Sequence, residues 1–296
     1  MQQTALKIES KHLWILQIAV AALFFGRAWQ HLVWDAPYRS LLWDQAWMEG
    51  IILRLTGLPW EQYITSMEVD DGIRTFVKCV GAFYVLCGTI ALLIRQNRRW
   101  MHWVLYLGSG SLLFLSFLYF KEKFFVPAQF FEYSLQWSAP LFLLYSVRYG
   151  SLSRRAAFAL RLAIAFTFTA HGLYALNVFP RPGIFMEMTM NILGVSETDA
   201  VRFLNLAGVL DLVLSVFIFF RGNLAKAALA YACFWGLATA LARVWAFFDW
   251  SQAGATLSQW LHETVMRSPH FLLPLLLLLL LLQWPYDRLK PEATEE

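Results

Sequence analysis

Long apolar segments recur along the whole chain and leave few folds open to it. Eight of these segments are about 20 residues long, which is the length of helix that crosses the hydrocarbon core of a membrane. Of the 296 residues 59% are hydrophobic and only 15% are charged. In a typical soluble domain about a quarter of the residues are charged. A β-barrel would show short alternating segments instead. The sequence therefore predicts an all-α polytopic membrane protein with eight transmembrane helices. The expected spans are Leu13–Trp34, Ile73–Ile94, Trp100–Phe120, Pro127–Val147, Ala156–Leu176, Ala200–Phe220, Ala225–Phe247 and Ser258–Leu282.

Basic residues are concentrated in alternate connections between these spans. The positive-inside rule places such connections in the cytoplasm, so both termini are predicted to be cytoplasmic in the cell membrane. The short basic loops also account for the net charge of +4, which therefore does not indicate a nucleic-acid partner; membrane lipid is the expected surrounding. The residues concerned are Lys7, Lys11, Arg95, Arg98, Arg99, Arg148, Arg154, Arg155, Arg221 and Lys226.

The connection from residue 35 to residue 72 is long, aromatic and expected to lie outside. In it Trp43, Trp47, Ile51 and Leu55 recur every four residues, which is the spacing of one helix face. This pattern predicts an amphipathic helix on the outer membrane surface, with docking of a partner protein as the alternative. The segment Ile184–Leu193 occupies the corresponding place in the second half of the chain, so outer interfacial helices are expected in both halves.

The two halves of the chain, residues 1–150 and 151–296, can be aligned helix by helix. Gln17 falls on Arg161, and Arg27 falls on His171. With four spans in each half, both copies have the same orientation, which predicts two parallel four-helix repeats. The other matched pairs are Lys78 with Asn205, Gly81 with Gly208, Tyr84 with Asp211, Glu132 with Glu263 and Gln136 with Arg267.

The second half resembles the DoxX-like family of small four-span membrane proteins. The resemblance rests on Arg161, on the pair His171-Gly172 ten residues later, and on the segment 208–232, which looks like the family's second span, inner turn and third span. Asp211 stands where the family tends to have glutamate, and no lysine follows the histidine-glycine pair near Ala175. The first half is the more divergent repeat. The resemblance implies a four-helix bundle unit, in a family that includes the small subunit of a thiosulfate:quinone oxidoreductase.

Ionisable and polar side chains inside the expected spans are concentrated toward the outer side. Such groups are costly in lipid and by default indicate a functional site. They predict a polar cavity, or one in each half, that opens to the outer face. The candidates for ligand binding or proton handling in the second half are Arg161, His171, Asp211, Arg243, Glu263, Arg267 and His270, and those in the first half are Arg27, His31, Lys78, Glu132 and Gln136.

Simpler roles remain open for several of these residues. Arg243 with Glu263, and Asp211 with Arg161, could be buried pairs that only fix the positions of helices. His171, Glu263 and His270 offer metal-ligating atoms, but Arg267 lies between the last two and would repel a cation. No metal site is therefore predicted.

Three classes of function remain, and whether the protein is itself an enzyme is left open. The first is a quinone-binding membrane subunit of an oxidoreductase, whose redox centre belongs to a partner protein on the outer face. Histidine and arginine can donate to a quinone carbonyl and a carboxylate can carry the proton, although a lipid head group would use the same donors. The alternatives are an assembly or scaffold protein that recruits its partner through the outer aromatic loop, and a transporter. No covalently bound cofactor is expected.

Overall fold

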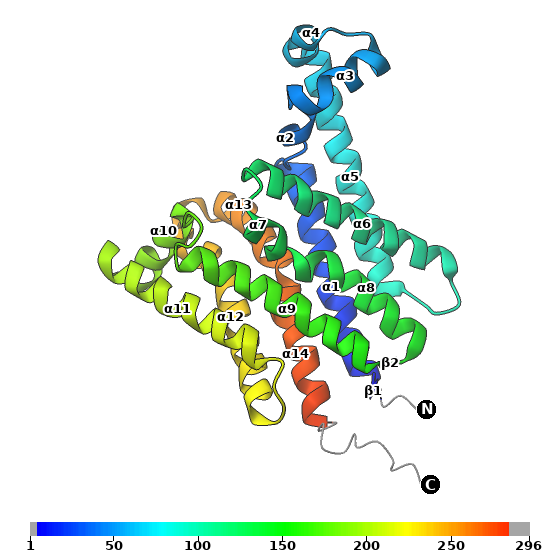
Figure 1. Ribbon diagram of the computed structural model, residues 1–296. Coiled ribbons are helices and arrows are strands. Elements are labelled where there is room, and N and C mark those ends of the chain that lie inside the picture. The colour runs from blue at the N-terminus through cyan, green and yellow to red at the C-terminus, as the bar shows by residue number, and fades with distance from the viewer. Residues whose placement is uncertain (1–4, 284–296) are drawn as a thin grey trace.

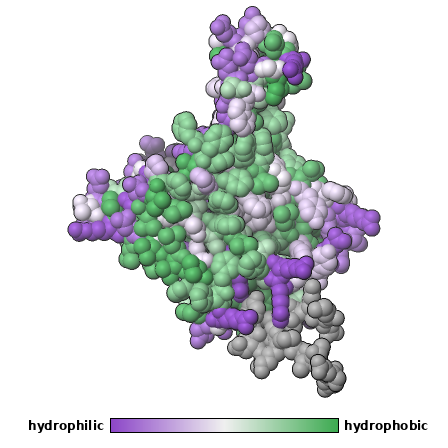
Figure 2. All heavy atoms as spheres, in the orientation of Figure 1, coloured by the Kyte–Doolittle hydropathy of each residue, from purple (hydrophilic) through white to green (hydrophobic). Residues whose placement is uncertain are grey.

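The computed structural model describes residues 5–283, and almost all of this part is helical. Seven helices are long and apolar enough to cross a membrane, by their length and composition. The predicted all-α class is confirmed, and the protein has the build of a polytopic membrane protein (Figure 1). The seven are α1 Ser10–Val33, α5 Met67–Leu93, α6 Arg99–Glu122, α9 Arg154–Ala175, α11 Glu197–Phe217, α12 Asn223–Phe247 and the segment Trp250–Gln283. Figure 2 shows apolar side chains over the middle of the bundle and hydrophilic ones toward its ends.

The fourth expected span, Pro127–Val147, is not one long helix. It is divided into α7 (Pro127–Glu132) and α8 (Ser134–Tyr149) by Tyr133, whose backbone has φ −89° and ψ 6°. The last segment is divided in the same way into α13 (Ala253–Met266) and α14 (Ser268–Gln283) by Arg267, with φ −88° and ψ 5°. Because α8 alone is short, the described residues contain seven long apolar helices and not the predicted eight.

The two breaks change the expected alignment of the fourth spans. Pro140 in α8 and Pro274 in α14 lie the same number of residues after their breaks. A match by these positions places Gln136 on His270, whereas the sequence alignment placed it on Arg267. Each proline lacks an amide hydrogen, so it leaves the carbonyl four residues earlier, that of Gln136 or His270, without its helical hydrogen bond.

The same helix pairs pack together in each half of the chain. Helix α1 packs on α5 as α9 packs on α11, and α6 packs on α8 as α12 packs on α14. Across the middle, α1 contacts α13 and α14 while α9 contacts α7 and α8. The core lies where α1, α8, α9 and α14 meet, around the fully buried Leu16, Leu143, Leu160 and Leu276.

Glycines let the first two long helices of each half approach closely. A Cβ on Gly208 would lie 2.8 Å from the Gly172 carbonyl oxygen and 2.8 Å from Cγ of Leu176. A Cβ on Gly81 would lie 2.8 Å from Cγ of Leu32. The contact of α5 with α1 therefore has the same form as the contact of α11 with α9.

A short antiparallel ladder joins the beginnings of the two halves. Strand β1 (Leu6–Lys7) pairs with β2 (Ser151–Leu152), directly before α1 and α9. We call this end of the bundle the proximal end and the opposite end, which carries α7, α10 and α13, the distal end (Figure 1). Gln283, at the end of α14, donates a hydrogen bond to Glu9 at the proximal end.

Short helices cover the distal connections. They are α2 (Arg39–Leu42), α3 (Gln45–Thr56), α4 (Trp60–Thr65), α10 (Gly183–Leu193) and the 3-10 turn η1 (Trp250–Gln252). Helices α3 and α4 project beyond the bundle at the start of α5 (Figure 1). The expected helix in the outer loop is thus present as α3, with Trp43 just before it. The apolar stripe is exposed, up to 78% at Leu55.

Asp44 fixes the start of α3. Its side chain accepts a hydrogen bond from the Trp47 amide and an ion-pair contact from Lys121 at the end of α6. Hydrogen bonding from Lys121 is the largest cause that lowers the pKa of Asp44 below its ordinary value of 3.8. The carboxylate is therefore charged at neutral pH, and the contact attaches the projecting helices to the bundle.

Candidate functional site

A cavity of about 250 Å³ lies in the second half of the chain. Its walls come mainly from α10, α11 and α12, with further residues from α9, from Glu132 of α7, and from Arg267 and His270 at the start of α14. Most of the surface is apolar and aromatic, and it includes Phe168, Phe185, Met188, Leu193, Phe203 and Trp235. A hollow of this kind, with a few polar groups in one wall, is the usual form of a small-molecule site.

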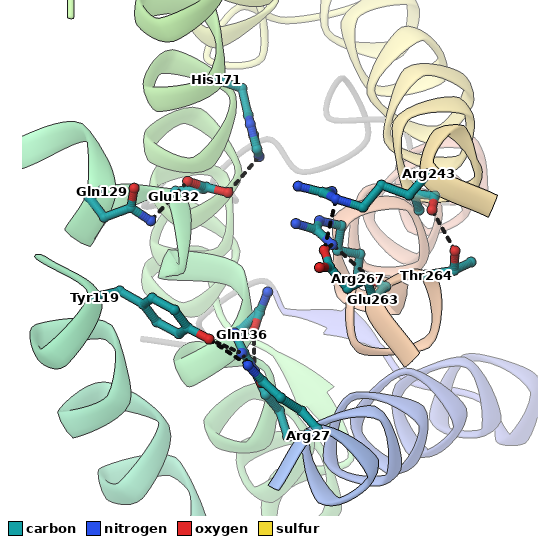
Figure 3. A network of polar contacts seen from close by, with 12 residues as sticks. Arg27, Tyr119, Gln129, Glu132, Gln136, His171, Arg243, Glu263, Thr264 and Arg267 are labelled. Atoms are coloured by element: carbon teal, nitrogen blue, oxygen red, sulfur yellow. Dashed lines mark hydrogen bonds and ion pairs between the residues drawn. The ribbon is translucent and has the colours of Figure 1, made fainter. Parts of the chain in front are cut away.

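The cavity brings together half of the residues that the sequence singled out. Glu263 does not line the cavity but holds two of the arginines that do, and Figure 3 shows this network. The candidates in the cavity wall are Glu132, His171, Asp211, Arg243, Arg267 and His270.

Two arginines share one carboxylate at this wall. Glu263 Oε2 lies 2.9 Å from Arg243 Nε and 2.6 Å from Arg267 Nη1. Arg267 also donates to the Glu263 backbone oxygen at 3.1 Å, which its position at the helix break allows. The three side chains are largely buried, and buried charges are tolerated only when they are paired. The cluster carries one excess positive charge and presents two guanidinium groups to the cavity.

A carboxylate from the first half of the chain completes this wall. Glu132, the last residue of α7, places Oε1 4.0 Å from Nε2 of His171. Its other oxygen accepts from Gln129 at 3.2 Å, and Gln129 in turn accepts from the Tyr174 hydroxyl at 3.1 Å. The ring of His171 lies 5.8 Å from that of His270, measured between centroids. A proton acceptor and two imidazoles therefore stand side by side.

Asp211 and Arg161 do not form the pair that the sequence left open. Asp211 lines the cavity from α11, and the ion pairs between described residues do not include one between Asp211 and Arg161. Arg161 is buried on α9 and is not part of the cavity wall. The two residues thus lie in different surroundings: Asp211 packs against Gly172 on α9, where an added Cβ on the glycine would lie 3.1 Å from Cβ of Asp211.

The remaining first-half candidates form a separate, filled network. Arg27 donates to Gln136 Oε1 at 3.1 and 2.6 Å and to Gln30 at 2.7 Å. Its guanidinium also lies over the rings of Tyr119 and Tyr133, at 5.5 and 5.1 Å from their centroids.

The other two first-half candidates lie apart from the cavity. His31 contacts the Arg27 carbonyl oxygen at 2.7 Å and the Tyr38 hydroxyl at 3.3 Å. Lys78 is exposed on α5. The sequence predicted one polar cavity, or one in each half. A cavity lies in the second half, and in the first half Arg27, Gln136 and Tyr84, all buried, take the corresponding positions.

Two features of the site had no signal in the sequence. Glu132 was expected to serve the first half, yet α7 packs on α9 and brings it to the second-half cavity. The wall formed by α10 depends on its position over α11 and α12. There Asn191 donates to the Ala246 oxygen at 3.3 Å, and Arg181 bonds both the Ala175 oxygen and Asn205.

The described residues contain no group of three or more His, Cys, Asp or Glu side chains that could hold a metal ion. Comparison of the chain with models of known protein families, with curated proteins and with solved structures finds no match. The resemblance to the DoxX-like family therefore stays a prediction.

Proposed function

We propose that the protein is a membrane subunit that binds the head group of a quinone in the second-half cavity, as part of an oxidoreductase system. The observation that carries this proposal is the pair of guanidinium groups and the pair of imidazoles in the wall of an otherwise apolar hollow. Arg243 and Arg267 can donate to a carbonyl oxygen, and Glu132 beside His171 can accept or return a proton.

The size of the cavity favours a head group over a whole ligand. Its volume of about 250 Å³ falls just below the roughly 300 to 1,000 Å³ of sites that enclose a drug-sized ligand. It suits one substituted ring, with the apolar tail outside among the lipid. An amphipathic ligand that approaches from the membrane meets this requirement.

We propose further that the chain is two parallel four-helix units, residues 1–150 and 151–296, which cross the membrane eight times in all. The matched helix packing, the matched breaks at Tyr133 and Arg267, and the matched glycine contacts support this arrangement. Helices α7 and α8 together then make the eighth crossing. The basic residues near β1 and β2 support a cytoplasmic location for the proximal end and both termini of a cell-membrane protein, and in this arrangement the cavity serves the outer half of the bilayer.

Quinone binding is tested by purification of the protein in mild detergent, followed by mass spectrometry of the extracted small molecules. Quinone at about one molecule per chain is the expected result. His171→Ala should reduce quinone retention at least tenfold, while the matched variant Lys78→Ala, far from the cavity, should retain it. A phospholipid in place of quinone, or equal retention by both variants, contradicts the proposal.

The exposed apolar stripe of α3 favours a second candidate, an assembly protein that recruits a partner on the outer side. Trp43, Trp47, Ile51 and Leu55 are all at least 43% exposed. In this case replacement of residues 45–65 by a short flexible linker removes a stoichiometric partner, and mutation of the cavity has no effect on that partner. No observation in the structure favours a transporter over these two.

A further inference from the structure

A second hollow lies between the end of α5 and the start of α6. Its lining combines two arginines with apolar side chains and differs throughout from the lining of the second-half cavity. Figure 2 shows hydrophilic side chains around this connection, next to the apolar surface of the bundle. The lining residues that matter here are Leu93, Arg95, Arg98, Trp100 and Met101.

Hydrogen bonds hold the connecting turn at the proximal end of the bundle. The Arg98 amide donates to the Arg95 carbonyl oxygen at 3.2 Å, and Nε2 of His102 contacts the same oxygen at 3.1 Å. Gln96 donates to the Arg148 carbonyl oxygen at 2.9 Å, near the end of α8 and just before β2. The backbone that carries the arginines is therefore fixed on the bundle, and the hollow is a formed feature of the fold.

The positive charge at this hollow has no counter-charge among the described residues. Arg95 and Arg98 line it, and Arg99 follows at the start of α6. The ion pairs between described residues include none with these three, and the sequence from residue 72 to residue 121 has no Asp or Glu. At the distal end, by contrast, Arg39 is held by Asp70 at 2.6 Å. The proximal arginines are therefore available to an anion from outside the protein.

Apolar side chains lie beside the arginines on both helices. Leu93 at the end of α5 is 58% exposed, and Trp100 at the start of α6 is 53% exposed. Exposed tryptophan is typical of the level of the lipid head groups. The positive-inside rule accounts for arginines in such a connection, but it does not account for a hollow that has two of them in an otherwise apolar lining. This combination suits a molecule with an anionic head and an apolar chain.

We propose that this hollow binds the head group of an anionic phospholipid, with its phosphate on Arg95 and Arg98. The first part of an acyl chain then lies along Leu93 and Trp100. Guanidinium groups suit phosphate because their N–H groups can donate to two oxygens at once. A zwitterionic head group is less suitable, since its ammonium group is repelled by the excess of positive charge. This inference goes beyond the proposed function and does not depend on it.

The test titrates delipidated protein in mild detergent with phosphatidylglycerol or with phosphatidylcholine, and native mass spectrometry measures the bound lipid. The first phosphatidylglycerol is expected to bind about tenfold more tightly than phosphatidylcholine, because only the former has a net negative charge. Equal affinity for the two lipids overturns the proposal. Glycerophosphoglycerol, the same head group without acyl chains, is expected to bind more weakly. If it binds as tightly as the lipid, the hollow takes a free phosphodiester and the assignment of a lipid is wrong.

Two double variants separate a site from general surface charge. Arg95→Gln with Arg98→Gln should weaken the binding of phosphatidylglycerol about 25-fold, since each arginine contributes about a factor of five. Arg221→Gln with Lys226→Gln removes the same charge from the matched connection between α11 and α12 and should leave the affinity unchanged. Equal losses in the two double variants would show that the lipid is attracted by charge alone, and would overturn the proposal.

The arginine variants are expected to fold because both side chains are exposed. The midpoint of thermal unfolding without lipid checks this. If the double variant does not fold, the single variants Arg95→Gln and Arg98→Gln decide, each with an expected loss of about fivefold. Unchanged affinity in both single variants overturns the proposal.

Discussion

The two halves of the protein use the same helix packing to build a filled core in one case and a cavity in the other. When the halves are matched by their helix contacts and breaks, Arg27, Tyr84 and Gln136 occupy the places of His171, Asp211 and His270. In the first half Arg27 donates to Gln136 and lies over the ring of Tyr119, and the Tyr84 hydroxyl bonds to that of Ser111. In the second half the smaller aspartate and histidines leave space between them.

The difference shows that the cavity is a property of a few side chains and not of the helix framework. It also shows two ways to bury an arginine. Arg27 lies among amides and aromatic faces, whereas Arg243 and Arg267 are held by Glu263. Only the second arrangement leaves guanidinium groups in a cavity wall, available to a ligand.

The largest effect is expected from removal of the shared carboxylate. Glu263→Ala leaves two buried guanidinium groups without their partner and should lower the free energy of unfolding by about 3 to 5 kcal/mol. Gln129 lies the same number of residues before the break at Tyr133 as Glu263 does before that at Arg267. Gln129→Ala should cost less, about 2 kcal/mol, since it removes one hydrogen bond to a carboxylate and one from a hydroxyl but no counter-charge of a buried arginine. Unfolding in a denaturant series in detergent measures both. Similar losses in the two variants would show that the charges of Arg243, Arg267 and Glu263 are not coupled.

The next contrast concerns how each half is packed. Tyr84 is fully buried and fills the first half, so Tyr84→Ala should cost about 3 to 5 kcal/mol through the void that it leaves. Phe203 already faces the cavity, and Phe203→Ala should cost only about 1 kcal/mol while it weakens ligand binding. Thermal unfolding with and without ligand distinguishes the two. A larger loss for Phe203→Ala would mean that the cavity is closed in solution.

The third comparison uses Gly81 and Gly208, which lie at corresponding helix contacts of the two halves. In Gly208→Ala the new methyl group meets the Gly172 backbone, which cannot move aside, and about 1 to 2 kcal/mol of stability should be lost. In Gly81→Ala it meets the side chain of Leu32, and the higher helix propensity of alanine offsets most of the strain. Denaturant midpoints for the two variants check the order. A greater loss in Gly81→Ala would contradict it.

The smallest effect is expected at the projecting helices of the first half. Lys121→Met removes the contact with Asp44 and should speed trypsin cleavage after Arg54 in α3, without a change in global stability. Lys123→Met, two residues further along, is the control, because Lys123 is exposed and forms no ion pair among the described residues. Time courses on denaturing gels measure the rates. Equal rates in both variants would show that α3 is held by packing alone.

Much of the framework follows from the sequence because lipid restricts the choice of structure. Apolar runs of about 20 residues can hardly be anything but membrane helices, and the long helices lie where the runs predict them. The sequence could not show that Tyr133 and Arg267 interrupt the fourth spans. Both residues fit a continuous helix by propensity. The bonds beside the breaks go to helices distant in sequence, from the Leu135 amide to Thr167 and from the Ser268 hydroxyl to the Ala19 oxygen.

The site was predictable in its members but not in its arrangement. His171, Arg243, Glu263, Arg267 and His270 were singled out because charge inside a membrane is costly, and they do lie together. Arg27, His31 and Gln136 of the first half lie apart from this cluster. Their place depends on the volume of side chains such as Tyr84, which the sequence pattern does not relate to a particular space. Lys78 lies away from the cavity because α5 buries only one face, and single residues do not reveal which face that is.

The ladder between β1 and β2 has a mechanical consequence for the whole molecule. Backbone hydrogen bonds clamp the starting points of α1 and α9 together, so these two helices cannot slide past each other or separate there. Relative motion of the halves is restricted to a splaying about this fixed point, with the greatest displacement farthest from it. An opening between the halves would therefore widen toward the distal end, while the proximal end stays closed.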